Sequence, residues 1–321
     1  MGTSSRHLFA MAASVRRVLF LKIVSWQPTA FFHSGFRLLA VDKDLLVKLR
    51  KRTGYSFVNC KKALEKFNSD SKQAEEWLHK QAQKEGWSKA SKLQERKTKE
   101  GLIGVLQDQN CAVMVEVNCE TDFVARNINF QQLVHQAALE TMAHYHNAQV
   151  DVPTYIKRFL CADDLSKLKT GSGDSSLSDL VALSIGKLGE NMTLKRAAWV
   201  AVPSNMYIGS YVHGALPVED PSLASMVFGK YGALVICQTA DLNLKAELGR
   251  RLGQHVVGMT PLSVGSLDDE PGGDTETKML AQPFLLEPSV TVGQYVQPMG
   301  VSILDFVRFE CGEVIESVAA G

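Results

Sequence analysis

The sequence contains no phosphate-binding loop and no cluster of metal ligands. No segment follows the pattern Gly-x-x-x-x-Gly-Lys-Ser/Thr, so we expect no direct binding of a nucleotide. The six cysteines are scattered without a Cys-x-x-Cys pair, which argues against a zinc site and against a disulfide framework. No histidine has a nucleophile or carboxylate partner at a recognisable catalytic spacing. The sequence therefore predicts no enzyme, no cofactor and no metal, and indicates a protein that acts by binding.

Aspartate and glutamate are absent from the first 41 residues, which contain five basic residues and five serines. Such a leader is typical of an organellar transit peptide. Its apolar run, residues 18–24, is interrupted by Lys22 and is far shorter than the ~20 residues that span a membrane. The same charge argues against a secretory signal. We therefore expect residues 1–41 to be a mitochondrial transit peptide, a location in the mitochondrial matrix, and no membrane anchor.

The rest of the chain divides by charge. Its 321 residues are 45% apolar and 21% charged, as in a soluble globular protein of two or three domains. Residues 42–100 hold 16 basic and 9 acidic residues, whereas residues 101–321 hold 14 basic and 25 acidic ones. A basic front segment could bind RNA or match an acidic protein surface. Its five aromatic residues lie at helical spacing and indicate core packing, which favours the protein surface; an RNA-binding, translation-associated protein remains an alternative.

Residues 42–86 have the pattern of three short helices. Apolar side chains recur every three to four residues from Phe57 to Phe67. The third helix opens at Asp70, three residues before Gln73, which is close to a capping box. Residues 87–100 are rich in Lys, Arg, Gln and Glu, and we expect a charged helical linker there.

Residues 101–321 contain a strand-turn-strand arrangement twice. Apolar, β-branched runs at residues 101–106 and 112–117 are followed by a helical pattern, and runs at 207–213 and 232–237 are followed by another. We therefore predict an α+β fold in which residues 101–203 and 204–321 form two similar subdomains with antiparallel strands. No long heptad run is present, so we expect no coiled-coil dimer.

A polar turn follows the second of these strands, in the segment Asn118-Cys-Glu-Thr-Asp-Phe-Val124. A large aromatic residue, Phe123, stands directly after Asp122 and before a helical pattern. Its side chain either packs back onto its own domain or remains exposed for the pocket of a partner, and this segment alone does not decide between the two.

The same segment resembles the signature loop of the elongation factor Ts family, the nucleotide exchange factors of the GTPase elongation factor Tu. Other segments resemble the family in the same order, over roughly residues 44 to 313. They are Leu49-Arg-Lys-Arg-Thr-Gly54, Asn59-Cys-Lys-Lys-Ala-Leu64, Lys187-Leu-Gly-Glu-Asn-Met192, Gly209-Ser-Tyr-Val-His-Gly214, Gln254-His-Val-Val-Gly-Met-Thr-Pro261, Thr291-Val-Gly-Gln294 and Val307-Arg-Phe-Glu-Cys-Gly-Glu313. Collinear matches of this number are far more specific than any one of them.

The resemblance implies a function, a partner and a set of contact residues. It implies guanine nucleotide exchange on elongation factor Tu in mitochondrial translation, in a 1:1 complex, with an N-terminal bundle that is ubiquitin-associated-like (UBA-like). In the family the aromatic residue enters a pocket beside the GTPase's magnesium and phosphate site. The implied partner-binding residues are Thr121, Asp122, Phe123, Val124, Leu188, Gly189 and His255. His255 also lies on an apolar helical face with Leu252 and Met259, which by itself predicts core packing. A UBA-type adaptor remains a second alternative.

Overall fold

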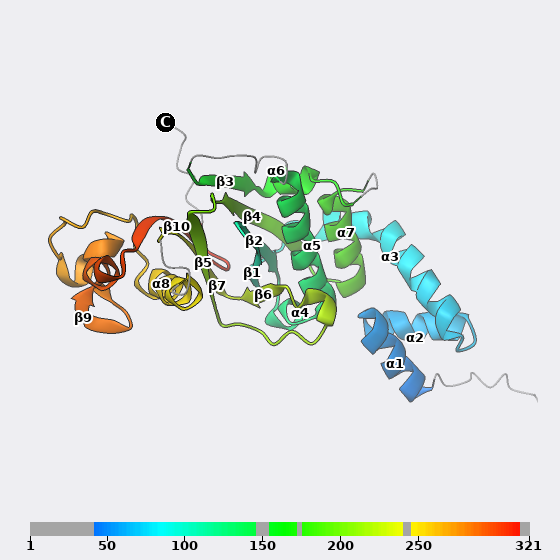
Figure 1. Cartoon of the computed structure of the whole chain (residues 1–321). Coiled ribbons are helices and arrows are strands. Elements are labelled where there is room, and N and C mark those ends of the chain that lie inside the picture. Colours follow the sequence, from blue (N-terminus) through cyan, green and yellow to red (C-terminus); the bar gives the residue numbers. More distant parts are fainter. Residues whose placement is uncertain (1–41, 146–153, 172–174, 240–244, 315–321) are drawn as a thin grey trace, which may run out of the picture. The chain divides into compact units, whose positions relative to one another are not determined.

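The computed structural model describes residues 42–145, 154–171, 175–239 and 245–314. The predicted transit peptide lies outside these residues. None of the helices in the described ranges combines the length and the apolar composition that crossing a membrane requires. The described chain begins with helices and continues with antiparallel sheets covered by further helices (Figure 1). The mixed α+β class with N-terminal helices is therefore confirmed.

Three helices open the chain: α1 (Lys43–Thr53), α2 (Phe57–Lys66) and α3 (Ser71–Leu93). Their N-caps are Asp42, Ser56 and Asp70, whose side-chain oxygens accept hydrogen bonds from backbone N–H groups of the first turns. The buried side chains of the three helices form one small core. Its members are Leu49, Tyr55, Cys60, Ala63, Leu64, Ala74, Leu78 and Ala82.

The structure differs from the prediction for this region in the burial of two aromatic residues and in the extent of the third helix. Phe57 and Trp87 are 46% and 55% exposed rather than buried; Phe57 opens α2, where the Arg50 guanidinium lies over its ring at 4.4 Å. The segment predicted as a charged helical linker is helical as far as Leu93, where α3 ends. The second half of α3 stays helical since Ala90 and Leu93 pack against the core of the first sheet.

Helix α3 crosses α7 (Leu177–Leu188) at small residues. A Cβ atom on Gly86 would lie 2.5 Å from the carbonyl oxygen of Ala182, and one on Gly186 would lie 2.6 Å from that of Ala82. Any larger side chain at either glycine would push the helices apart. The sequence therefore brings the two helix backbones into direct contact.

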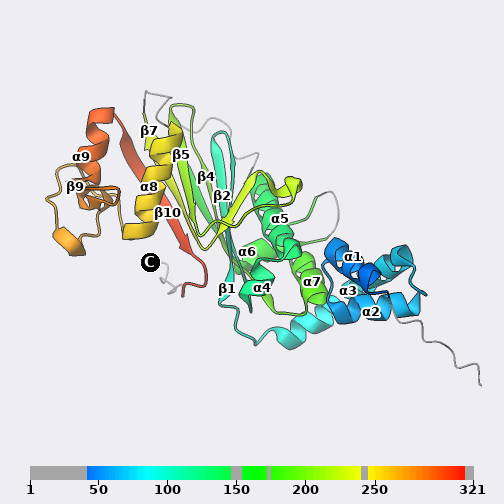
Figure 2. The same ribbon diagram turned by 90° about the horizontal axis from the view of Figure 1, so that it is seen from below.

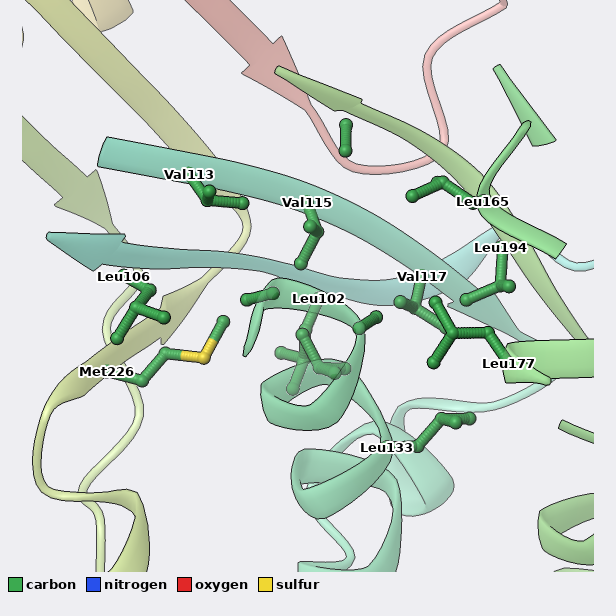
Figure 3. Close-up of a cluster of buried hydrophobic side chains, with 14 of the residues drawn as sticks. Leu102, Leu106, Val113, Val115, Val117, Leu133, Leu165, Leu177, Leu194 and Met226 are labelled. Carbon is green, nitrogen blue, oxygen red and sulfur yellow. The ribbon is translucent and has the colours of Figure 1, made fainter. Parts of the chain in front are cut away.

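The first sheet has the strand order β3-β4-β2-β1-β6. Its strands, β1 (Glu100–Asp108), β2 (Cys111–Cys119), β3 (Ile156–Cys161), β4 (Met192–Ala201) and β6 (Met226–Gly229), all pair antiparallel. Helices α4 (Asp122–Ala125), α5 (Ile128–Tyr145), α6 (Ala162–Lys167) and α7 accompany this sheet (Figure 2). Figure 3 shows the core between them, where alternate residues of β1 and β2 such as Leu102, Val115 and Val117 meet Leu133 of α5.

The second sheet has the order β10-β7-β5, with β5 (Met206–His213), β7 (Tyr231–Gln238) and β10 (Ser302–Glu310) antiparallel. Helix α8 (Lys245–Met259) packs on β5, where Gly209 meets Gly249 without intervening side chains. A further group of apolar side chains packs between the second faces of the two sheets. Among its members are Ile103, Met114, Ala198, Ile208, Leu234, Ile236 and Val307.

Both predicted strand pairs and both helices that follow them are confirmed, with one difference. The insert between the second pair contains β6, which pairs with β1 of the first sheet. After α8 the chain forms the short hairpin β8 (Pro283–Phe284) and β9 (Glu287–Thr291), and then the one-turn helix α9 (Val292–Val296). The N-cap of α9 is Thr291, whose hydroxyl oxygen accepts a hydrogen bond from the backbone N–H of Gln294 at 3.2 Å.

Candidate functional site

Phe123 lies on the one-turn helix α4 and is 82% exposed. The next two residues, Val124 and Ala125, are buried in the core of the first sheet. These two side chains fix α4 to the sheet, and the opposite side of the turn carries Phe123 outward. The phenylalanine therefore does not pack back onto its own domain. Asp122 forms an ion pair with Arg126 along the same turn, at 3.3 Å.

Thr121 connects α4 to the end of α7. Its hydroxyl oxygen accepts a hydrogen bond from the backbone N–H of Val124 at 3.4 Å and caps the helix. The same hydroxyl donates to the carboxylate of Glu190, whose two oxygens lie 2.9 and 3.0 Å away. Glu190 directly follows Leu188 and Gly189. The structure therefore brings together two segments that are separated by more than 60 residues in the sequence.

Glu120 forms a second connection between the same two segments. Its carboxylate accepts a hydrogen bond from the backbone N–H of Asn191 at 2.6 Å and faces the Arg96 guanidinium at 3.5 Å. The Asn191 side chain in turn donates to the backbone carbonyl of Arg96 at 2.8 Å. The exposed loop is consequently attached to α7 on one side and to the chain after α3 on the other.

These connecting residues were not among the predicted site residues. Glu120, Glu190 and Asn191 lie inside two of the segments that carry the family resemblance. One signal could have identified them. A carboxylate or amide that the fold buries beside a turn needs a hydrogen-bond partner. Which partner it finds depends on the packing of β2 against β4.

Leu188 and Gly189 differ in what they present to the surface. The Leu188 side chain is half-buried against the core of the first sheet. Gly189 is exposed and ends α7 in the left-handed region, with φ of 83°. Glycine suits this conformation because it has no Cβ to clash with the backbone. The end of α7 thus offers exposed backbone next to the α4 turn.

His255 is fully buried, which corrects the expectation that its side chain contacts a partner. The backbone N–H of Leu285 donates to Nδ1 at 3.2 Å, so the proton lies on Nε2, which donates to Oε1 of Gln282 at 3.0 Å. Burial lowers the pKa of His255 to about 4, and the ring is neutral near pH 7. The core packing that the apolar helical face predicts is the arrangement observed.

The bonds of His255 join α8 to the β8–β9 hairpin. Gln282 is buried, and its amide nitrogen also donates to the carbonyls of Met259 and Glu276 at 3.2 and 2.7 Å. Leu285 and Leu286, at the hairpin turn, are 37% and 38% exposed. His255 therefore acts on the surface only through the position of this turn.

The described residues contain no group of three or more His, Cys, Asp or Glu side chains that could hold a metal ion. The exposed elements around α4 are instead an aromatic ring, a helix end and an ion pair. Such an arrangement can insert into a partner and bind it.

In the comparison with known proteins, the matching family models and the relatives named below all point to one family. The family model described as "Elongation factor Ts, mitochondrial, N-terminal" matches residues 29–88, and the one described as "Elongation factor TS" matches residues 120–270. Proteins named "Elongation factor Ts, mitochondrial" are 68% identical over 299 residues in Xenopus laevis (92% of this chain and 95% of the relative) and 65% identical over 291 residues in Homo sapiens (89% of each). One from Nematostella vectensis is 46% identical over 293 residues, covering 85% of this chain and 99% of the relative.

Proposed function

This chain belongs to the elongation factor Ts family in its mitochondrial form, and we propose that it releases GDP from elongation factor Tu by inserting Phe123 into the GTPase. Members of this family are nucleotide exchange factors in translation elongation and are not enzymes. Exchange needs no bond chemistry. The factor stabilises the nucleotide-free GTPase, so factor and nucleotide weaken each other's binding to the same extent.

The observation that carries the proposal is the 82% exposure of Phe123 on a turn whose neighbouring side chains are buried. A thousandfold faster release of GDP requires about 4 kcal/mol of differential stabilisation, at roughly 1.4 kcal/mol per factor of ten. A single aromatic residue at the centre of an interface contributes ~2–4 kcal/mol. One inserted ring with a few supporting contacts is therefore of the right size.

The other residues of the loop fit supporting roles in the same proposal. Val124 anchors the turn and Thr121 caps it, while Asp122 orients it or meets the edge of the GTPase. Leu188 and Gly189 form a second contact beside it. Because Thr121 and Glu120 bond to Glu190 and Asn191, the loop is held before binding, which reduces the entropy lost in the complex.

His255 has an indirect role in this proposal. Its side chain is buried, so we assign it the positioning of the hairpin turn at residues 285–286. The GTPase then meets that turn and not the imidazole.

The organisation of the chain completes the proposal. Residues 1–41 are the transit peptide, residues 42–86 a UBA-like bundle and residues 87–100 the charged connection to the body. Residues 101–203 and 204–321 are two similar subdomains, and the second ends in a C-terminal module that includes residues 306–312. The working complex is one copy of this chain with one copy of the GTPase, and the bundle contacts the nucleotide domain of the partner.

Release of fluorescent GDP from elongation factor Tu tests the role of Phe123. Phe123→Ala should slow stimulated release by roughly one to three powers of ten, as expected for an interface anchor. Its melting temperature should stay close to wild type, because truncating an exposed side chain has little effect on stability. Phe159→Ala is the matched control, since Phe159 is also exposed (58%) but lies on the edge strand β3. Normal release with Phe123→Ala, or equal losses in both variants, would contradict the proposal.

A further inference from the structure

A pocket with a volume of about 360 Å³ opens beside the α4 turn. It lies between the α4–α5 connection and the loop at residues 214–220, which leads from β5 toward β6. One of its lining residues, Arg126, follows Phe123 by three positions. The lining residues are Arg126, Ile128, Gln131, Leu216, Pro217 and Glu219.

Gln131 is the unusual member of this lining. Its side chain is only 6% exposed, and within the described part of the chain its amide group has no hydrogen-bond partner. The backbone N–H of Gln131 donates to Asn127, as the helix requires. Buried amides nearly always find partners, since an unpaired one is unfavourable. The Gln131 amide is not among the fully buried polar groups that lack a partner in the described residues, so it meets the water of the pocket that Gln131 lines.

The rest of the lining determines which group would suit this amide. Ile128, Leu216 and Pro217 provide apolar walls, which favour an apolar stem. The charges of Arg126 and Glu219 are opposite, so the lining has no net charge. Arg126 is in addition paired with Asp122. An ionised head would thus gain little, whereas an uncharged amide or hydroxyl could bond to Gln131.

We propose that this pocket receives a side chain of the GTPase that has an apolar stem and an uncharged, hydrogen-bonding head, with Gln131 as its partner. The inference rests on the proposed function, because Arg126 of the lining is the C-cap of α4, the helix that carries Phe123. The contact forms alongside the inserted ring and not at its tip. It therefore adds binding energy to the complex and leaves the maximal rate of release unchanged.

Gln131→Met tests the proposal, because methionine keeps the size of the side chain and removes its hydrogen bonds. In the free protein the change removes an amide that bonds to no described residue and meets water in the pocket, so the melting temperature should stay close to wild type. In the complex it removes a bond, and the affinity for nucleotide-free elongation factor Tu should fall by about 5- to 30-fold. The concentration for half-maximal GDP release should rise by a similar factor, with the maximal rate unchanged.

Gln136→Met is the matched control on the same helix, because the Gln136 amide already donates to Glu140 at 2.6 Å. It should leave the affinity unchanged. Wild-type affinity with Gln131→Met would overturn the pocket proposal and indicate an amide that is only solvated. Equal losses in both variants would also overturn it. Phe123→Ala is measured in parallel: if it has no effect, or if the wild-type chain does not stimulate release, the proposed function itself fails.

Discussion

This protein has two strand-strand-helix halves, and each contains a residue that the family resemblance marks as a partner contact. These two residues lie in opposite environments. In the first half the chain leaves β2 through α4, and Phe123 is 82% exposed. In the second half it leaves β7 for α8, and His255 is fully buried. Two residues that the same family resemblance marks therefore differ in what their side chains can do. One can touch a partner, and the other holds a surface element in place.

The two halves also differ in what supports the surface element. The strand that leads to Phe123 contains the fully buried Glu116, which pairs with Arg196 of β4 at 2.7 Å. The hairpin turn of the second half depends on the neutral His255. An ion pair supports the surface element of the first half, and a neutral ring supports that of the second. Changes in pH and substitutions should therefore affect the stability of the two halves differently.

The largest expected effect comes from breaking the buried ion pair in the first half. Glu116 also accepts hydrogen bonds from Asn118 and from the backbone N–H of Gly312, at 3.1 and 2.8 Å. Glu116→Ala leaves the Arg196 guanidinium, which is 15% exposed, with one carboxylate fewer, and should lower the free energy of unfolding by ~3–5 kcal/mol. Denaturant unfolding measures the change. Glu287→Ala, on an exposed residue of β9, is the control, and an equally small loss in both variants would refute a structural role for the pair.

The next effect is a pH dependence in the second half. The folded state lowers the pKa of His255 to about 4 from 6.5, so the unfolded chain binds more protons between these values. The contribution of His255 to stability should be present above pH 6.5 and decline as the pH falls toward 4, by up to ~3 kcal/mol.

Two variants of His255 separate this dependence from simple packing. His255→Asn can keep an acceptor for the Leu285 N–H, whereas His255→Gln can keep a donor toward Gln282. Both should reduce the loss of stability between pH 6.5 and 4, measured by thermal unfolding. If Leu285 is the element that matters for the GTPase, the asparagine variant should retain more exchange activity than the glutamine variant. The reverse order would show that the hairpin turn is not the part that His255 positions.

A smaller effect is expected at the connection between α4 and α7. Thr121→Val removes the cap and the bond to Glu190, and should reduce stability by ~1–2 kcal/mol. Stimulated GDP release should also slow, because the loop is then less well held. Thr121→Ser keeps the hydroxyl and should restore both properties. A serine variant as impaired as the valine variant would mean that the methyl group, and not the hydroxyl, matters.

The smallest effect is expected at Gly189. A Cβ there would meet no atom within 4 Å, so only the positive φ of 83° opposes a side chain. Gly189→Ala should therefore reduce stability by about 1 kcal/mol. Thermal unfolding gives this value. A much larger loss would imply that residue 189 is packed, which contradicts the open end of α7.

Much of the architecture was accessible from the sequence because it depends on local patterns. Apolar, β-branched runs predicted β1, β2, β5 and β7, and helical spacing of apolar residues predicted α5 and α8. The same reasoning failed at Phe57 and Trp87, where helical spacing alone did not show which side of the helix meets the core. It also ended the third helix too early, because the contact that keeps Ala90 and Leu93 helical comes from the first sheet.

By itself the sequence determined the helices and strands of the two repeated halves, the position of the turns and the family to which the chain belongs. It also placed an aromatic residue on the polar turn after β2, with two possible orientations. Only the tertiary structure decided that Phe123 faces solvent while His255 is buried, and that Thr121 lies against Glu190. The physical reason is that the exposure of a side chain and its hydrogen-bond partners depend on contacts between residues far apart in the chain. No local sequence pattern encodes such contacts.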